Sequence, residues 1–227
     1  MQAVILAAGE GIRLRGESIV PKCLLRVGKK TVLEHLLSQL PKEIREVIIV
    51  VGELKNQIKK HIGTNFNGRH IRYALQTEPL GTGHALSVCK DILDDKKFLV
   101  LMGDNLYLKR DMESCLRHDL CLLTQKIEAP ERFGVVKVED GNLEDVIESP
   151  KLSAGTLVNC GLYVLDKKIF NYLKPNHELE KETFEQLAKE KQIAAFKHNG
   201  FWKSMNTLKE VIELNEMFKK GNTPWIK

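Results

Sequence analysis

The sequence lacks an apolar stretch long enough to cross a membrane. Its longest apolar runs, residues 47–51 and 98–102, have only the length of a strand. It also lacks a cysteine pattern, because its 5 cysteines are scattered and none forms a Cys-x-x-Cys pair. No secretory signal is recognisable. These absences predict a cytoplasmic protein whose cysteines are small buried apolar residues, and no membrane is expected as a partner.

The sequence also lacks a strong excess of positive or negative charge. The chain has 35 Lys and Arg against 30 Asp and Glu, a net charge of +5. No Lys/Arg-rich run is interleaved with aromatic residues, which make up only 6% of the chain, so nucleic acid is not an expected partner. A modest positive charge suits a protein that handles phosphorylated small molecules.

The length of 227 residues and the hydrophobic content of 43% predict one sizeable α/β domain over residues 1–227, with two halves at about 1–110 and 111–227. Apolar strand candidates alternate with helical patterns in the first half. Because those strands are continuously apolar, we expect them to be buried on both faces. The predicted fold is therefore a Rossmann-like α/β fold, in which a mixed, mostly parallel sheet carries helices on both faces.

The individual elements follow from the same patterns, and an Asp140-Gly141 pair between two strands predicts a tight hairpin turn. Strands are predicted at residues 3–6, 47–51, 71–75, 98–102, 120–127, 134–138, 143–148 and 156–165. Helices are predicted at residues 32–40, 54–62, 83–93, 182–191 and 208–218.

A glycine-rich loop follows the first strand candidate, but two common nucleotide motifs are missing from it. Leu14 stands where a dinucleotide-binding loop has its third glycine, and no P-loop Gly-Lys-Ser/Thr is present. Small residues after a strand still let backbone N–H groups approach phosphate oxygens. Arg13 and Lys22 are placed to neutralise charge on such phosphates. We therefore predict a phosphate-binding loop of a third kind, with a simple strand–turn–helix that carries surface basic residues as the alternative for this segment alone.

The segment AVILAAGEGIRLR…PKCLLRVGKKTVLEHLL resembles the signature of the sugar-1-phosphate nucleotidyltransferase family, and the resemblance extends over nearly the whole chain. It implies that the first half binds the nucleotide and the second half the sugar. It also implies that the loop wraps the triphosphate, through Leu6, Ala7, Ala8, Gly9, Glu10, Gly11, Arg13 and Lys22. Ile12 departs from the family's usual Thr or Ser, which leaves the pyrophosphate contacts at that position in doubt.

A second segment, QTEPLGTGHA, follows the third strand candidate. Its glutamine, Gln76, offers a donor and an acceptor that together match the imide edge of a pyrimidine. From chemistry alone, a plain polar loop that ends in a helix start is an equal alternative. The segment resembles the uridine-binding loop of N-acetylglucosamine-1-phosphate and glucose-1-phosphate uridylyltransferases. That resemblance implies UTP as substrate, with Gln76, Gly81 and Thr82 at the base, and a structural role for His84.

The fourth strand candidate ends in Gly103-Asp104, where a carboxylate is well placed to bind Mg²⁺. A simple turn aspartate is the alternative. The family resemblance implies that Asp104 is the principal metal ligand and, with Arg13 and Lys22, a catalytic residue. It also places the second ligand near the segment FWKSMNT, where we expect Asn206.

The second half carries three short elements that resemble the family's sugar-binding elements: PERFGVV, ESP and NCG. They imply that the sugar is bound by Gly134, Glu148 and Asn159, and we expect Asn105, directly after Asp104, to bind it as well. Ser149 stands where the family has lysine, which leaves the contact to the sugar phosphate in doubt; Lys151 and Lys203 are the candidates to replace it.

The C-terminal segment instead resembles glucose-1-phosphate cytidylyltransferases. We favour UTP because the middle segment would contact the base directly. The predicted reaction is Mg²⁺-dependent transfer of a nucleotidyl group from UTP to a sugar 1-phosphate. Two alternatives stay open: a CTP-dependent enzyme acting on glucose 1-phosphate or a phospho-alcohol, and a non-catalytic nucleotide-sugar-binding regulatory subunit. The identity of the sugar and assembly into a homo-oligomer also stay open.

Overall fold

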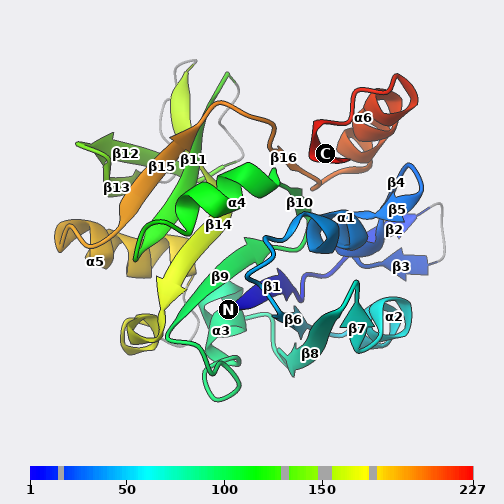
Figure 1. Ribbon diagram of the computed structural model, residues 1–227, viewed down its shortest axis with the longest axis horizontal. Helices are drawn as coiled ribbons and strands as arrows, with labels where there is room; N and C mark the ends of the chain where they lie inside the picture. Colours follow the sequence, from blue (N-terminus) through cyan, green and yellow to red (C-terminus); the bar gives the residue numbers. More distant parts are fainter. Residues whose placement is uncertain (15–17, 129–132, 148–154, 174–177, 227) are drawn as a thin grey trace.

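The computed structural model describes residues 1–14, 18–128, 133–147, 155–173 and 178–226, with the backbone alone for residues 12–14 and 18. Its centre is one sheet of 10 strands in the order β11-β15-β13-β12-β14-β9-β1-β6-β8-β7 (Figure 1). This mixed sheet confirms the predicted α/β class. It contains strands from both halves of the chain.

The first half supplies four parallel strands in the order β8-β6-β1-β9. Their bounds are β1 Gln2–Ala7, β6 Glu46–Val51, β8 Arg69–Leu75 and β9 Lys97–Met102. Strands β1, β6 and β9 are almost continuously apolar and buried, as expected for strands covered on both faces, whereas β8 near the sheet edge has several polar, partly exposed residues. A short edge strand, β7 (Asn65–Phe66), pairs antiparallel with β8.

The second half is mostly antiparallel, which corrects the expectation of a mostly parallel sheet. Strand β14 (Thr156–Asp166) runs antiparallel to β9 and joins the two halves. The other strands are β11 (Cys121–Ile127), β12 (Val135–Glu139), β13 (Asn142–Ile147) and β15 (Ala194–His198). Only β11 and β15 pair in parallel there, among the described residues. Strand β15 was not predicted, because its five residues carry no clear apolar alternation.

The predicted hairpin turn at Asp140-Gly141 joins β12 to β13 and is confirmed. Both residues have positive φ, 49° at Asp140 and 78° at Gly141. A two-residue turn with both angles positive matches the right-handed twist of the strands that it connects.

Helices cover both faces of the sheet, as predicted. Alternate residues of each central strand point to opposite sides and supply two separate apolar cores. One core includes residues of α1 (Val32–Gln39), α2 (Lys55–Ile62) and α4 (Lys109–Cys115). The other includes residues of α3 (Gly81–Ser87) and α5 (Phe184–Lys189). Helix α4 was not predicted. Helix α3 is shorter than expected, because residues 88–92 continue as i→i+3 turns.

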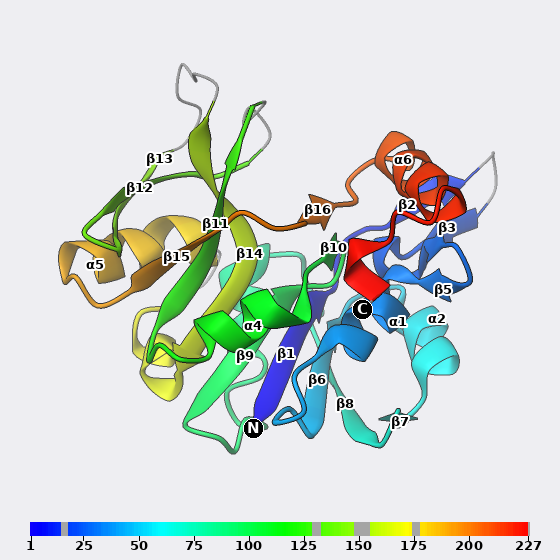
Figure 2. The same cartoon turned by 45° about the horizontal axis from the view of Figure 1, so that its top comes forward.

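A third apolar core joins the last helix, α6 (Leu208–Lys219), to the segment that follows the glycine-rich loop. Figure 2 shows α6 beside the short strands of the N-terminal segment. Asn215 connects them, since it accepts from the N–H of Gly28 and donates to the carbonyl of Arg26. The short strands of the N-terminal segment are β2 (Ile12–Leu14), β3 (Ser18–Val20), β4 (Arg26–Val27) and β5 (Lys30–Thr31). Two further short strands, β10 (Asn105–Leu106) and β16 (Lys203–Ser204), pair with each other.

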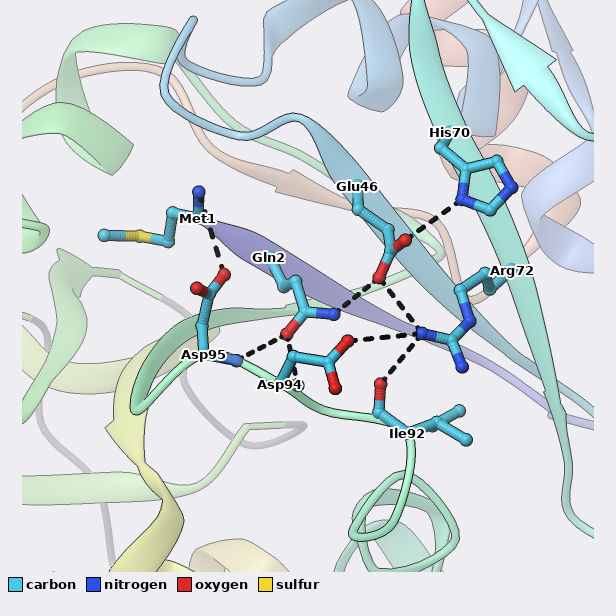
Figure 3. A network of polar contacts seen from close by, with 8 residues as sticks. All are labelled: Met1, Gln2, Glu46, His70, Arg72, Ile92, Asp94 and Asp95. Carbon is cyan, nitrogen blue, oxygen red and sulfur yellow. Dashed lines mark hydrogen bonds and ion pairs between the residues drawn. The ribbon is translucent and has the colours of Figure 1, made fainter.

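A polar network joins the amino ends of the parallel strands (Figure 3). Glu46 at the start of β6 accepts hydrogen bonds from Gln2 of β1 and Arg72 of β8, and it lies 3.0 Å from His70. Gln2 in turn accepts from the backbone N–H groups of Asp94 and Asp95. This network lies at the opposite end of the strands from Ala8, Gln76 and Asp104, which follow their carboxyl ends.

Two further predictions concern composition. All five cysteines are buried and unpaired, which confirms the expectation of small apolar residues. In the described ranges, no helix has the length and apolar character needed to cross a bilayer.

Candidate active site

Two adjoining pockets lie at the carboxyl ends of the parallel strands. Strands β1, β8 and β9 run in the same direction, so the residues that follow them meet at one edge of the sheet. Those residues are Ala8, Gln76 and Asp104, which come from three separate parts of the chain. Their convergence explains why three separate sequence segments build one site.

The first pocket has a volume of about 290 Å³ and contains most of the predicted nucleotide-binding residues. Its lining includes Leu6, Ala7, Ala8, Gly9, Lys22, Cys23, Gln76, Gly81, Thr82 and Asp104. Cys23 is no candidate nucleophile, because burial and the nearby Asp104 carboxylate raise the pKa of its thiol to about 12. Glu10 and Gly11 are not among the lining residues.

Small residues give the turn after β1 its shape. A Cβ at Gly52 would lie 2.7 Å from the carbonyl oxygen of Ala8, and one at Gly103 would lie 2.9 Å from that of Leu6. At Gly9, in contrast, an added Cβ would meet no atom within 4 Å, so this glycine faces open space. Gly11 has a φ of 82° and packs against the carbonyl of Val20, so its part is to shape the loop.

Gln76 has a fixed orientation at the wall of the first pocket. It is only 7% exposed, and its amide nitrogen lies 3.1 Å from the carbonyl oxygen of Gly81 and 3.2 Å from Nδ1 of His84. Because an amide N–H₂ only donates, Nδ1 of His84 must be the acceptor. His84 therefore holds Gln76 in place, in agreement with its predicted structural role. The Gln76 oxygen makes no hydrogen bond to any other described residue and is the group available to a ligand.

The second pocket has a volume of about 660 Å³ and lies on the side of β14. Three of the predicted sugar-binding residues, Asn105, Gly134 and Asn159, line it. Asn105 is 5% exposed and donates to the Tyr107 hydroxyl and the Cys160 carbonyl, both at 3.0 Å. The two pockets share Met102, Asp104 and Glu178, so they meet at Asp104.

Lys22, Asp104 and Asn206 come together where the pockets meet. The Lys22 ammonium lies 4.0 Å from Oδ2 of Asp104 and donates to Oδ1 of Asn206 at 3.3 Å. The pairing of β10 with β16 brings Asn206 here, since it aligns Asn105 with Ser204. Burial raises the pKa of the Asp104 carboxyl, and Lys22 opposes that effect.

The two oxygens fit a Mg²⁺ ion that takes further ligands from substrate phosphates. A carboxylate and an amide oxygen are the ligand types that Mg²⁺ prefers, and here both lie near a single cationic group, the ammonium of Lys22. Within the described ranges, no three His, Cys, Asp or Glu side chains form a metal-binding cluster.

Two predicted site residues, Glu148 and Arg13, fall where side chains are not described. Glu148, with Ser149 and Lys151, lies outside the described residues, and only the backbone of Arg13 is described, paired with Ile19 in the β2–β3 hairpin. Lys203, one candidate for the missing lysine, pairs with Glu213 at 3.1 Å and is not part of the second pocket's lining.

Several pocket residues were not predicted from the sequence: Met102, Tyr163, Glu178, Glu180 and Lys181. Tyr163 had a usable signal, because it shares one face of β14 with Asn159 and Gly161. The glutamates and the lysine had none, since nothing local indicates that the segment before α5 faces the sheet edge.

A family model described as nucleotidyl transferase matches residues 2–221 of the chain. The chain belongs to the nucleotidyl transferase family. This confirms the resemblance that the glycine-rich loop indicated.

Several curated members of the family are similar along almost the whole chain. The bifunctional protein GlmU of Methanocaldococcus jannaschii is 30% identical, over 98% of this chain and 56% of the relative. The chain therefore spans about half the length of that relative. Mannose-1-phosphate guanyltransferase of Saccharomyces cerevisiae is 30% identical over 97% of this chain and 66% of its own. Glucose-1-phosphate cytidylyltransferase of Salmonella typhi is 28% identical, over 99% and 98% respectively.

Solved structures share the fold. One from Bacillus anthracis, described as a glucose-1-phosphate thymidylyltransferase in complex with a sucrose, aligns with a TM-score of 0.84 and 24% identity, over 96% of this chain and 95% of that one. HddC from Yersinia pseudotuberculosis, complexed with GMP-PN, aligns with a TM-score of 0.74 and 24% identity, over 96% and 99%. At 24% identity these two structures show only that the fold is shared. The names of the relatives cover several different bases.

Proposed function

We propose that the chain transfers a nucleotidyl group from a nucleoside triphosphate to a sugar 1-phosphate and releases pyrophosphate. The observation that carries this proposal is the pair of pockets that meet at Asp104. Two phosphorylated reactants must approach each other at one phosphorus atom, and a basic side chain, Lys22, lies at the junction. Family membership supports the same reaction class.

The reaction needs alignment and charge neutralisation more than acid–base chemistry. A phosphate oxygen of the sugar 1-phosphate attacks the α-phosphorus. The bond from that phosphorus to the bridging oxygen of the β-phosphate then breaks, and its electron pair leaves with pyrophosphate. The attacking oxygen is already ionised, so no general base is required. Lys22 is placed to neutralise charge on the triphosphate, and we propose the same part for Arg13.

Asp104 and Asn206 would hold Mg²⁺ in this scheme. The bound ion would supply further neutralisation of phosphate charge. With one carboxylate and one amide assigned to it, the ion would bind together with the triphosphate. Lys22 lies near both side chains, 4.0 Å from Asp104 and 3.3 Å from Asn206.

We propose UTP as the nucleotide. The amide nitrogen of Gln76 is already engaged by Gly81 and His84, so the Gln76 oxygen, which is an acceptor, is the group left to contact the base. The N3–H of uracil is a donor that matches it, whereas N3 of cytosine is an acceptor. CTP is the alternative, and the 98% coverage of the Salmonella cytidylyltransferase is the observation in its favour.

The second pocket would bind the sugar 1-phosphate. Asn159 and Gly134 line it, and Lys181 supplies a basic side chain that could contact the sugar phosphate in place of the lysine missing at Ser149. We propose that Glu148 also binds the sugar, as the sequence implied.

We also propose a single domain over residues 1–227 and a cytoplasmic location, which the five free cysteines support.

A matrix of the four nucleoside triphosphates and dTTP against several sugar 1-phosphates, with Mg²⁺ and pyrophosphate release as readout, tests the proposal. We expect release with UTP and one sugar 1-phosphate. Turnover with CTP alone would replace UTP by the alternative. Tight binding of a UDP-sugar without turnover by any pair would favour a regulatory subunit and would overturn the proposed reaction.

A further inference from the structure

Glu180 connects the two pockets through a chain of hydrogen bonds. Its carboxylate accepts from the hydroxyl of Thr82, a lining residue of the first pocket. It also accepts at 2.8 Å from the hydroxyl of Tyr163, which lines the second pocket together with Asn159. Asn159 donates to that tyrosine oxygen at 2.9 Å. One side chain from the turn before α5 thus reaches lining residues of both pockets.

Each of the two hydroxyls has both a donor and an acceptor role in this chain of hydrogen bonds. The Thr82 oxygen accepts from the backbone N–H of Leu179 at 2.9 Å, and its hydroxyl donates to Glu180. The Tyr163 oxygen accepts from Asn159, and its hydroxyl donates to the other carboxylate oxygen of Glu180. Both carboxylate oxygens of Glu180 are therefore engaged as acceptors.

The same chain of hydrogen bonds orients Asn159 at the second pocket. Its oxygen accepts from the N–H of Gly161 at 2.9 Å, and one amide hydrogen goes to Tyr163. The remaining amide hydrogen is the group left to a ligand, so Asn159 presents a donor. A sugar hydroxyl oxygen or an acyl carbonyl oxygen would match it.

At its other end, near the first pocket, this chain of hydrogen bonds holds the start of helix α3. Thr82 is the second residue of α3, whose first turn lines the first pocket with Gly81, Thr82 and Ala85. The hydrogen bonds to Leu179 and Glu180 tie this turn to residues 179–183, a π-helical turn that leads into α5. Tyr163 also packs edge-on against Phe184 of α5, with ring centroids 4.8 Å apart.

We propose that Glu180 is a positioning residue that couples the two pockets. A ligand that engages Asn159 orders Tyr163 and Glu180, and Glu180 in turn orders Thr82 and the base-binding turn of α3. The second ligand then binds to a pocket that is already ordered, so its binding costs less conformational entropy. Each ligand therefore raises the affinity for the other by the same factor. This inference rests on the proposed function, because it takes the two pockets to be the two substrate sites.

The test measures that factor directly. The affinity for α,β-methylene-UTP, a non-reacting analogue, is determined by calorimetry with and without the sugar 1-phosphate that supports turnover, for example glucose 1-phosphate. For the wild type we expect the sugar phosphate to increase the nucleotide affinity by about 5-fold or more, the usual lower range of coupling between sites. In Glu180→Gln and Tyr163→Phe the factor should approach 1.

Tyr73→Phe is the matched control. It removes another hydroxyl that donates to a single protein acceptor, the carbonyl of Gly63 at 2.6 Å, away from both pockets. Its coupling factor should equal that of the wild type, and thermal unfolding checks that all variants are folded. Because Tyr163→Phe retains the ring, it serves as the readout if Glu180→Gln does not fold.

The outcomes separate this inference from the proposed function. If the wild type binds both ligands and turns them over with a factor of 1, the function stands and the coupling is wrong. An unchanged factor in both variants, or an equal loss in Tyr73→Phe, overturns the role of Glu180. If the wild type binds neither ligand, the proposed function fails and the inference with it.

Discussion

Lys22 donates a hydrogen bond of 3.3 Å to Asn206, which lies 184 positions further along the chain. The same ammonium is 4.0 Å from Asp104. The backbone around Asn206 is held by the N-terminal cap of α6, where Glu210 accepts from the N–H groups of Asn206 and Thr207. One cationic side chain thus links the glycine-rich loop, the end of β9 and the start of the last helix.

Replacing Asp104 by alanine should abolish turnover while the protein remains folded. The carboxylate is the only charged oxygen that we assign to the metal, so its loss should cost at least about 100-fold in rate. Pyrophosphate release and thermal unfolding measure the two effects. Asp119→Ala is the control, because its side chain is 108% exposed. Near-normal Mg²⁺-dependent activity of Asp104→Ala would remove this residue from the metal site.

Replacing Lys22 by alanine should lower kcat by roughly 100-fold, because the positive charge at the junction acts on the charge that develops during transfer. Lys42→Ala, an exposed lysine outside the pockets, is the control. Steady-state kinetics with varied nucleotide separate kcat from KM. An unchanged kcat with a raised KM would mean that Lys22 only binds the nucleotide.

Replacing Asn206 by aspartate should strengthen the metal site. A carboxylate binds Mg²⁺ more strongly than an amide oxygen, and it would also pair with Lys22. The Mg²⁺ concentration at half-maximal rate should fall about 5-fold, equivalent to about 1 kcal/mol. Titration of the rate with Mg²⁺ is the measurement. If Asn206→Asp leaves this concentration unchanged, Asn206 is not a ligand.

Replacing Gln76 by glutamate should weaken nucleotide binding. One carboxylate oxygen would face the carbonyl of Gly81, where the amide now donates at 3.1 Å, so the side chain would have to turn away. We expect the KM for the nucleotide to rise about 10-fold, the effect of losing one to two kcal/mol. Gln186→Glu on α5 is the control. Equal KM values in the two variants would exclude Gln76 from base recognition.

The Glu46 network predicts a pH-dependent stability that is separate from catalysis (Figure 3). Burial alone would raise the pKa of Glu46, but hydrogen bonds from His70, Gln2 and Arg72 outweigh it and lower that pKa. A carboxyl group with a lowered pKa in the folded state adds stability above its unfolded-state pKa. That contribution is lost as the pH falls through the folded-state pKa.

Glu46→Gln should therefore reduce the free energy of unfolding by about 1 kcal/mol at neutral pH. The difference from the wild type should shrink as the pH falls below 4.5, the ordinary value for this group. Urea unfolding at several pH values measures it, with the exposed Glu139→Gln as control. Turnover at neutral pH should be unchanged, because the network lies at the opposite end of the strands from the pockets. A difference that grows toward acid would contradict the assignment.

Much of the first half could be predicted because its signals are local. Short apolar segments between helical patterns identified the four parallel strands, and Gln76 and Asp104, which follow two of them, were recognisable as site candidates from the sequence alone. The antiparallel second half was harder to predict. Strand β15 is short and without alternation, and its place between β11 and β13 depends on pairings with residues more than about 50 positions away, which no local propensity encodes.

The sequence by itself identified the family and the glycine-rich loop after the first strand, because these signals lie within short segments of the chain. Only the tertiary structure decided which side chains meet. The contact of Lys22 with Asn206, the orientation of Gln76 by His84 and the connection of the pockets through Glu180 all depend on it. Such contacts depend on how β14, α3 and α6 pack, and no local pattern in the chain encodes that packing.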